Sequence, residues 1–121
     1  MKVLVVEGNW GIAQVLSSFV KLCGHVVDEA SDGRDAIHKL QGGRYDIVIT
    51  DSEIISVDGP ELCKFIKSHF QDIYIIGISG YLSALKDLKD AGADICFSEP
   101  FDINYLKRAI DCITFLRGPS A

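Results

Sequence analysis

Short runs of apolar, mostly β-branched residues alternate along the chain with longer stretches in which apolar residues recur every three or four positions. The short runs are typical of buried strands and lie at residues 3–6, 26–27, 47–49, 73–76 and 95–97. The longer stretches have the periodicity of amphipathic helices. The clearest of them contains Ile12, Val15, Leu16, Phe19, Leu22 and Cys23. The pattern predicts five strands that alternate with five helices.

Local signals at the ends of these stretches support the assignment. Asn9, Asp32, Asp58 and Asp102 stand where the N-caps of helices are expected. Gly24 and Gly92 stand just past predicted helix ends, where a glycine commonly terminates a helix. Strands that alternate with helices predict an α/β domain, with a doubly wound parallel sheet covered on both faces. We expect one domain over residues 1–121, with 118–121 as a tail or the stub of a linker.

Composition and charge narrow the class of function. Twelve Lys and Arg against 17 Asp and Glu give a net charge of −5, which argues against a nucleic-acid-binding domain. The apolar runs are too short to span a bilayer, and the N-terminus has no signal-peptide pattern, so we expect no membrane partner and a cytoplasmic location. We interpret the four cysteines as small buried hydrophobic residues in a reducing compartment. A zinc or disulfide site is the alternative.

Polar residues follow several of the predicted strands. In a doubly wound fold the carboxyl ends of the strands form the ligand-binding edge, so Glu7, Asp51, Ser79 and Glu99 are expected to converge there. Each of them could instead only solvate a turn or cap a helix. Asp51 is the hardest to explain in this way, because it comes directly after residues 47–50, which are predicted to form a buried strand. Dinucleotide-binding, P-loop and nucleophile-elbow motifs are missing from the sequence.

The order and spacing of several short motifs resemble the receiver domain of bacterial two-component response regulators, over nearly the whole chain. The matching segments are residues 3–7, 30–36, 45–51, 58–59, 92–94 and 99–101. The resemblance implies a flavodoxin-like fold: a five-stranded parallel sheet in the order 2-1-3-4-5, with helices on both faces. It also implies a signalling module rather than an enzyme.

The resemblance assigns roles to residues at the carboxyl edge. Asp51 matches the phosphoacceptor, and Ser79 matches the hydroxyl that contacts the phosphoryl group. Glu7, Asp51 and the backbone carbonyl of Glu53 match the positions that hold Mg²⁺. The implied partners are a sensor histidine kinase or phosphotransfer protein, and a downstream protein that binds the fourth helix, fifth strand and fifth helix. Tyr81 and Tyr105 are the contact residues that we favour on that face.

Three departures from the family weaken the expected site. Gly8 replaces the second acid of the usual pair, Glu99 replaces a lysine that usually contacts the phosphoryl group, and Cys96 replaces an aromatic residue that usually moves on activation. Mg²⁺ binding is therefore expected to be weak or absent, unless Glu99 substitutes as a ligand. We also expect a cis Glu99–Pro100 bond, and coupled titration of Asp51 and Glu99.

Two functional hypotheses follow from these matches and departures. The chain is either a phosphorylatable receiver or a pseudo-receiver that binds partners without phosphorylation. An enzyme that uses the acidic crevice for metal-assisted hydrolysis is a weaker third class, because no base–nucleophile pair with recognisable spacing supports it.

Overall fold

The computed structural model describes residues 1–118 and forms a five-stranded parallel sheet. The strands are β1 (Lys2–Val6), β2 (Val26–Ala30), β3 (Ile47–Asp51), β4 (Tyr74–Ser79) and β5 (Ile95–Ser98). Their order in the sheet is β2-β1-β3-β4-β5, which confirms the expected topology. The predicted tail lies outside the described residues except for Gly118.

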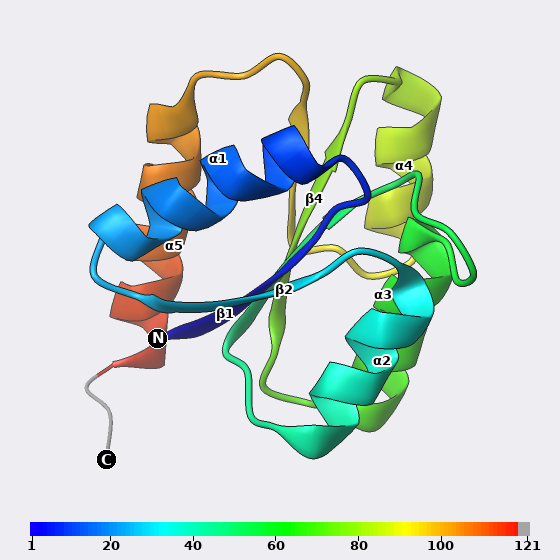
Figure 1. The fold of residues 1–121 in the computed structure, drawn as a ribbon, viewed down its shortest axis with the longest axis horizontal. Helices are drawn as coiled ribbons and strands as arrows, with labels where there is room; N and C mark the ends of the chain where they lie inside the picture. Colours follow the sequence, from blue (N-terminus) through cyan, green and yellow to red (C-terminus); the bar gives the residue numbers. More distant parts are fainter. Residues whose placement is uncertain (119–121) are drawn as a thin grey trace.

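Five helices connect the strands and cover both faces of the sheet. They are α1 (Trp10–Leu22), α2 (Gly33–Gly42), α3 (Gly59–His69), α4 (Leu82–Asp90) and α5 (Ile103–Arg117). Helices α1 and α5 lie on one face, and α2, α3 and α4 lie on the other (Figure 1). The four predicted N-cap residues each accept a hydrogen bond from the first turn of their helix. None of the helices over residues 1–118 is long and apolar enough to cross a membrane.

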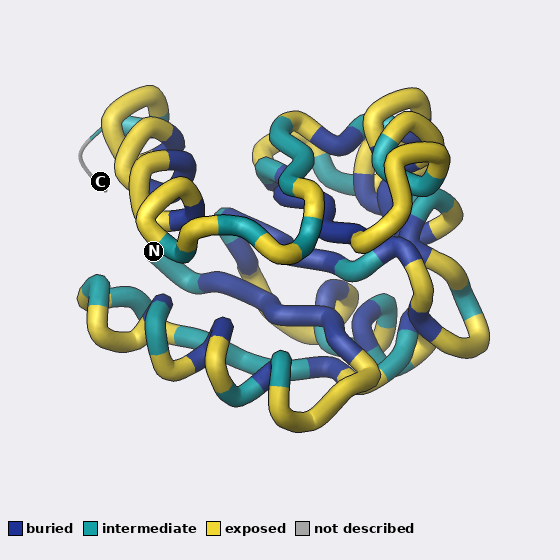
Figure 2. Tube along the Cα trace, turned by 90° about the horizontal axis from the view of Figure 1, so that it is seen from above, coloured by how far each residue is buried: buried dark blue, intermediate teal, exposed yellow. Residues whose placement is uncertain are grey.

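The core consists of two apolar layers, one on each face of the sheet. Leu4 and Val6 of β1 pack into the layer under α2, α3 and α4, whereas Val3 and Val5 pack into the layer under α1 and α5. The central strands β1, β3 and β4 therefore run as buried segments between exposed helix surfaces, whereas the edge strands β2 and β5 are partly exposed (Figure 2). This burial on both sides explains why the predicted strands lack alternation of polar and apolar residues.

The cysteine prediction is only partly correct. All four cysteines are free thiols, and Cys63 is buried, but Cys23 and Cys96 are partly buried and Cys112 is exposed. Cys112 lies on α5, whose buried face is formed by Leu106, Ala109, Ile110 and Ile113. With 3.6 residues per turn, position 112 falls outside this face, so the expectation of burial is wrong there.

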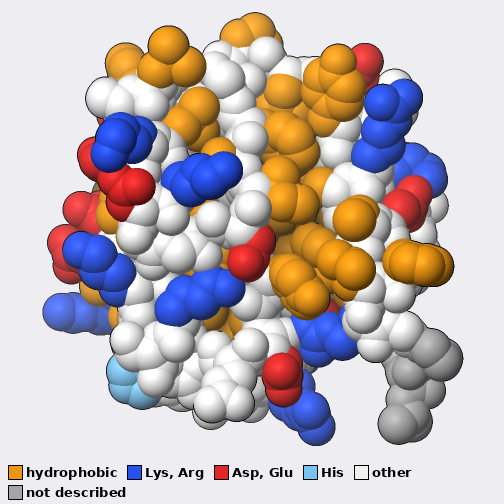
Figure 3. Space-filling model, turned by 180° about the vertical axis from the view of Figure 1, so that it is seen from behind, with side chains coloured by type: hydrophobic (Ala, Val, Ile, Leu, Met, Phe, Trp, Pro, Cys, Tyr) orange, Lys and Arg blue, Asp and Glu red, His pale blue; other side chains and the backbone are white. Residues whose placement is uncertain are grey.

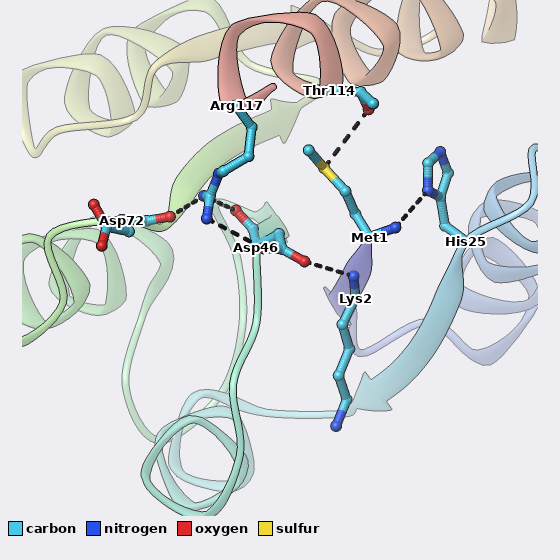
Figure 4. A network of polar contacts seen from close by, with 7 residues as sticks. All are labelled: Met1, Lys2, His25, Asp46, Asp72, Thr114 and Arg117. Carbon is cyan, nitrogen blue, oxygen red and sulfur yellow. Dashed lines mark hydrogen bonds and ion pairs between the residues drawn. The ribbon is translucent and has the colours of Figure 1, made fainter. Parts of the chain in front are cut away.

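The amino-terminal edge of the sheet is held together by the end of α5 (Figure 4). Arg117 lies 3.1 Å from the Asp46 carboxylate and donates a second hydrogen bond to the backbone carbonyl of Asp72. Asp46 also accepts the backbone N–H of Lys2 over 2.8 Å. These contacts join α5, β1 and the connections before β3 and β4, at the end of the molecule opposite the predicted site.

Candidate functional site

The strand register brings the predicted site residues to one edge of the sheet. Val6 of β1 pairs with Thr50 of β3, so the residues that follow them, Glu7 and Asp51, lie beside each other at the ends of neighbouring strands. Ser79 pairs with Ser98, and the backbone N–H of Glu99 donates to the Ser79 carbonyl over 2.8 Å. Because β1, β3, β4 and β5 are consecutive in the sheet, all four residues meet at its carboxyl edge. The convergence expected from the sequence is therefore present in the structure.

Asp51 is the last residue of β3, and its half-buried carboxylate lies at the edge of the sheet. The backbone N–H of Glu53 donates to Asp51 Oδ1 over 3.2 Å. The Ser52 hydroxyl lies 3.4 Å from the same oxygen. These contacts orient the carboxylate, while no basic side chain is paired with it among the described residues.

Ser79 is almost fully buried, and its hydroxyl oxygen is already an acceptor. The Ser52 hydroxyl donates to Ser79 Oγ over 2.8 Å, and the backbone N–H of Tyr81 donates to it over 3.1 Å. A serine hydroxyl has two acceptor lone pairs and one proton. Ser79 therefore belongs to a short hydrogen-bonded chain with the Ser52 hydroxyl and the Tyr81 backbone N–H at the carboxyl edge.

Glu7 has the most perturbed carboxyl group at this edge. Its side chain is only 4% exposed. Burial raises the pKa of Glu7 to about 8, with further contributions from a hydrogen bond to Asp51 and from the charges of Asp51 and Glu99. Because two carboxylates this close cannot both ionise cheaply, Glu7 keeps a proton at neutral pH when no cation is present.

Glu99 follows β5 and is half-buried at the same edge of the sheet. Burial raises the pKa of Glu99, and the charge of Asp51 raises it further. A raised pKa at Glu99 agrees with the coupling expected for Asp51 and Glu99. The pKa of Glu7 is raised further still, and the sequence led to no prediction for that group. The Glu99–Pro100 bond is cis, as predicted. None of the ion pairs formed within residues 1–118 includes Glu7, Asp51 or Glu99.

The oxygen atoms at this edge of the sheet are of the kind that bind a small divalent cation. Mg²⁺ is usually held by one or two carboxylates, with water and phosphate oxygens completing its shell. Glu7 and Asp51 provide two carboxylates, and the repulsion between them is what a cation would relieve. A cage of three acidic, histidine or cysteine side chains is not found among the described residues. Gly8 contributes no side chain, although a Cβ there would meet only Ser31 O, at 3.5 Å.

Sequence reasoning missed Ser52 as a member of the site. Its hydroxyl is buried and bridges Asp51 and Ser79. Its position directly after the predicted phosphoacceptor was the available signal, but a serine after a strand is also a common turn residue. Only its contacts with Asp51 and Ser79 distinguish a site residue from a turn residue at this position.

Comparison with known proteins agrees with this arrangement. The family model described as the response regulator receiver domain matches residues 3–111. The sporulation initiation phosphotransferase F of Bacillus subtilis is 30% identical over 111 residues, which cover 90% of each chain. The transcriptional regulatory protein TcrA of Mycobacterium tuberculosis is 28% identical over 121 residues, but these cover only 47% of that longer protein and 98% of this chain.

A solved structure of a response regulator shows the same fold. The response regulator TrrA of Thermotoga maritima, in complex with Mg²⁺ and beryllofluoride, has a TM-score of 0.86 and 28% identity. The similarity covers 93% of this chain and 98% of that chain. One assignment follows from the order of the strands, the acidic residues at their carboxyl ends and the match to the family model. The chain belongs to the family of response regulator receiver domains.

Proposed function

We propose that this receiver domain accepts a phosphoryl group on Asp51 and signals through protein contacts. The observation that carries the proposal is that the half-buried Asp51 carboxylate and the Ser79 hydroxyl lie at the same edge of the sheet, bridged by the Ser52 hydroxyl. An Asp51 oxygen would attack the phosphorus of the donor as the bond from phosphorus to the leaving group breaks. In the product, the Ser79 hydroxyl would turn to donate to a phosphoryl oxygen.

The cation chemistry of this reaction is weakened at two positions. Bound Mg²⁺ would neutralise the charge of the transferring group, and Glu7, Asp51 and the Glu53 carbonyl are the groups that would hold it. Gly8 provides no further carboxylate, and Glu99 adds negative charge where the family has a lysine. At an effective dielectric constant of about 20, each unit charge at ~4 Å is worth roughly 4 kcal/mol. We therefore expect slow phosphorylation of the natural sequence.

The proposed donor is a sensor histidine kinase or phosphotransfer protein, and the proposed output face is formed by α4, β5 and α5. Seen from behind, apolar side chains gather in a band down the middle of the molecule (Figure 3). β5 is the edge strand, and α4, α5 and the residue before α4 contribute exposed apolar side chains: Tyr81, Leu82, Tyr105 and Leu116. Exposed aromatic residues are common anchors of protein interfaces.

The proposed partners and location follow from the net charge of the domain and from phosphoryl transfer as its mode of action. A net charge of −5 does not suit a nucleic-acid or membrane surface, so we assign neither partner to the domain. We propose a signalling role in the cytoplasm, where the phosphoryl donors would be found. We do not propose an enzyme of metal-assisted hydrolysis, because the crevice pairs no nucleophile with a base.

The test is the mass of the intact protein after incubation with acetyl phosphate and Mg²⁺. We expect slow addition of one phosphoryl group to the natural sequence and none to Asp51→Asn. Glu61→Gln, an exposed change on α3, is the matched control and should react like the natural sequence. Addition that persists in Asp51→Asn would refute the proposed acceptor. No addition at any donor concentration would favour the pseudo-receiver.

A further inference from the structure

The N-terminus of α2 is capped mainly by the loop that follows Asp51. The first residues of a helix have backbone N–H groups without partners inside the helix. In α2, the Gly33 N–H donates to the Ile55 carbonyl over 3.0 Å, and the Arg34 N–H donates to Ser56 Oγ over 3.0 Å. Only the third group, the Asp35 N–H, is capped within its own segment, by the Asp32 carboxylate at 2.8 Å. Two of the three caps therefore come from residues 52–58, which we call the 52–58 loop.

Ser56 holds this loop in an unfavourable backbone conformation. Its φ of 69° is the only positive φ of a non-glycine residue in the part of the chain that the structure describes. The Val57 N–H donates to the Ile55 carbonyl over 2.9 Å, which closes a γ-turn around Ser56. A γ-turn with positive φ is rare and strained. Such strain persists only where neighbouring contacts hold it, and here the Ser56 hydroxyl accepts from the Arg34 N–H and donates to the Ile55 carbonyl over 2.6 Å.

The packing between the 52–58 loop and α2 leaves little room for independent movement. A Cβ built on Gly33 would lie 2.0 Å from the Val57 carbonyl oxygen and 2.8 Å from the Val57 carbonyl carbon. The backbone of α2 thus lies directly against the backbone of the loop. At the other end of the loop, a Cβ on Gly59 would lie 2.6 Å from the Asp51 carbonyl oxygen. Displacement of the loop must therefore disturb its contacts with α2.

The same loop begins at the carboxylate that we propose as the phosphoacceptor. The Glu53 N–H donates to Asp51 Oδ1, and the next residue, Ile54, is buried in the apolar layer under α2, α3 and α4. Ile55 and Ser56, which cap α2, follow directly. Any group bonded to Asp51 changes the acceptor of the Glu53 N–H, so the chemical state of Asp51 acts on the start of this loop.

We propose that the 52–58 loop is a mechanical link through which the state of Asp51 controls the capping of α2. This link depends on the proposed function in one respect: Asp51 is the residue whose chemical state changes. It gives the domain a second response, at the α2 side of the sheet, separate from the α4–β5–α5 face.

The test measures the amide shifts and hydrogen-exchange rates of Gly33 and Arg34 by NMR. Asp51 is perturbed in two independent ways: by the substitution Asp51→Asn, and by Mg²⁺ with beryllofluoride as a phosphoryl mimic. Both perturbations are applied to the natural sequence, to Ser56→Ala and to the control Ser83→Ala, which changes an exposed serine of α4. Ser56→Ala alone should speed exchange of the Arg34 amide about fivefold, the equivalent of one lost hydrogen bond of ~1 kcal/mol.

Each outcome has a distinct meaning. If the link exists, the Gly33 and Arg34 amides respond to Asp51→Asn in the natural sequence and in Ser83→Ala, and lose most of that response in Ser56→Ala. An unchanged response in Ser56→Ala, or no response of either amide to Asp51→Asn, would overturn it. If acetyl phosphate fails to label Asp51 while the response to Asp51→Asn persists, the link stands and the phosphoacceptor proposal fails.

Discussion

At the scale of single residues, the proton on Glu7 is the feature that most distinguishes this site. A glutamate after a strand usually faces water, but here burial and two neighbouring carboxylates raise its pKa to about 8. The sequence identified Glu7, Asp51 and Glu99 because each lies at or just past the carboxyl end of a strand. It could not predict which carboxyl holds the proton, because that depends on burial and on distances across three strands. The role of Ser52 was hidden for the same reason.

The raised pKa of Glu7 predicts how the stability of the metal-free protein depends on pH. Between pH values near 5 and 8, Glu7 is ionised in the unfolded chain but protonated in the folded one. The folded state then binds more protons, so the free energy of unfolding should fall as pH rises through this window, by about 2 to 4 kcal/mol. The lowered pKa of His25 acts in the opposite direction, but only near and below its ordinary value of 6.5.

Urea denaturation between pH 5 and 8 in the presence of a chelator would measure this dependence. Glu7→Gln should remove most of the slope and make the protein more stable at pH 8 than the natural sequence. Glu61→Gln should keep the slope, because Glu61 is exposed on α3. An equal slope in the natural sequence and in Glu7→Gln would show that Glu7 is ionised at neutral pH.

At the scale of the elements, the sequence predicted which segments form helices and strands, but it did not predict how loops meet helices. Asn9, Asp32, Asp58 and Asp102 were identifiable because capping is local. The capping of α2 by Ile55 and Ser56 joins segments more than twenty residues apart and has no local signal. The exposure of Cys112 was missed because its type suggests burial, whereas the orientation of α5 decides it.

The contact between α2 and the 52–58 loop predicts opposite effects for two glycines of the same helix. Gly33→Ala places a Cβ against the Val57 backbone and should lower the free energy of unfolding by about 2 kcal/mol or more. Gly42→Ala meets nothing within 4 Å and should raise it by about 0.5 kcal/mol, because alanine restricts the unfolded chain. Thermal and denaturant unfolding of both variants would measure the difference. Equal stability of the two would contradict the close packing.

The end of α5 offers a further prediction at the same scale. Arg117 binds Asp46 and the Asp72 carbonyl, so Arg117→Ala should cost about 1 to 2 kcal/mol and loosen the last turn of α5. Arg108→Ala removes only an exposed cation over the Tyr105 ring, 5.9 Å from its centroid, and should cost less than about 1 kcal/mol. Hydrogen-exchange rates along α5 would distinguish the effects of Arg117→Ala and Arg108→Ala. Similar protection of residues 113–116 in both variants would show that Arg117 does not hold the helix end.

At the scale of the whole molecule, the two ends of the sheet differ in how their charged groups are paired. The amino-terminal edge is closed by the Arg117 network, where charges are paired and the chain is held together (Figure 4). At the carboxyl edge, Glu7, Asp51 and Glu99 meet without a paired cation among residues 1–118. Strand order fixes this division, and strand order was predictable from the family resemblance. We propose that the reactivity of the edge depends instead on the residues at positions 8 and 99.

The most direct test of the account is to restore those two side chains and measure phosphorylation of Asp51. A Cβ at position 8 has room, so Gly8→Asp can add a carboxylate, and Glu99→Lys exchanges the negative charge for a cation. The rate of acetyl phosphate labelling in Mg²⁺ should rise only partly in each single variant. It should rise most in the double variant, because both groups act on one transition state.

Labelling of the double variant should require Mg²⁺ and should disappear when Asp51→Asn is added. A natural sequence that is labelled as fast as the double variant would contradict the assigned roles of Gly8 and Glu99. A double variant that remains unlabelled would contradict the assignment of Asp51 as the phosphoacceptor.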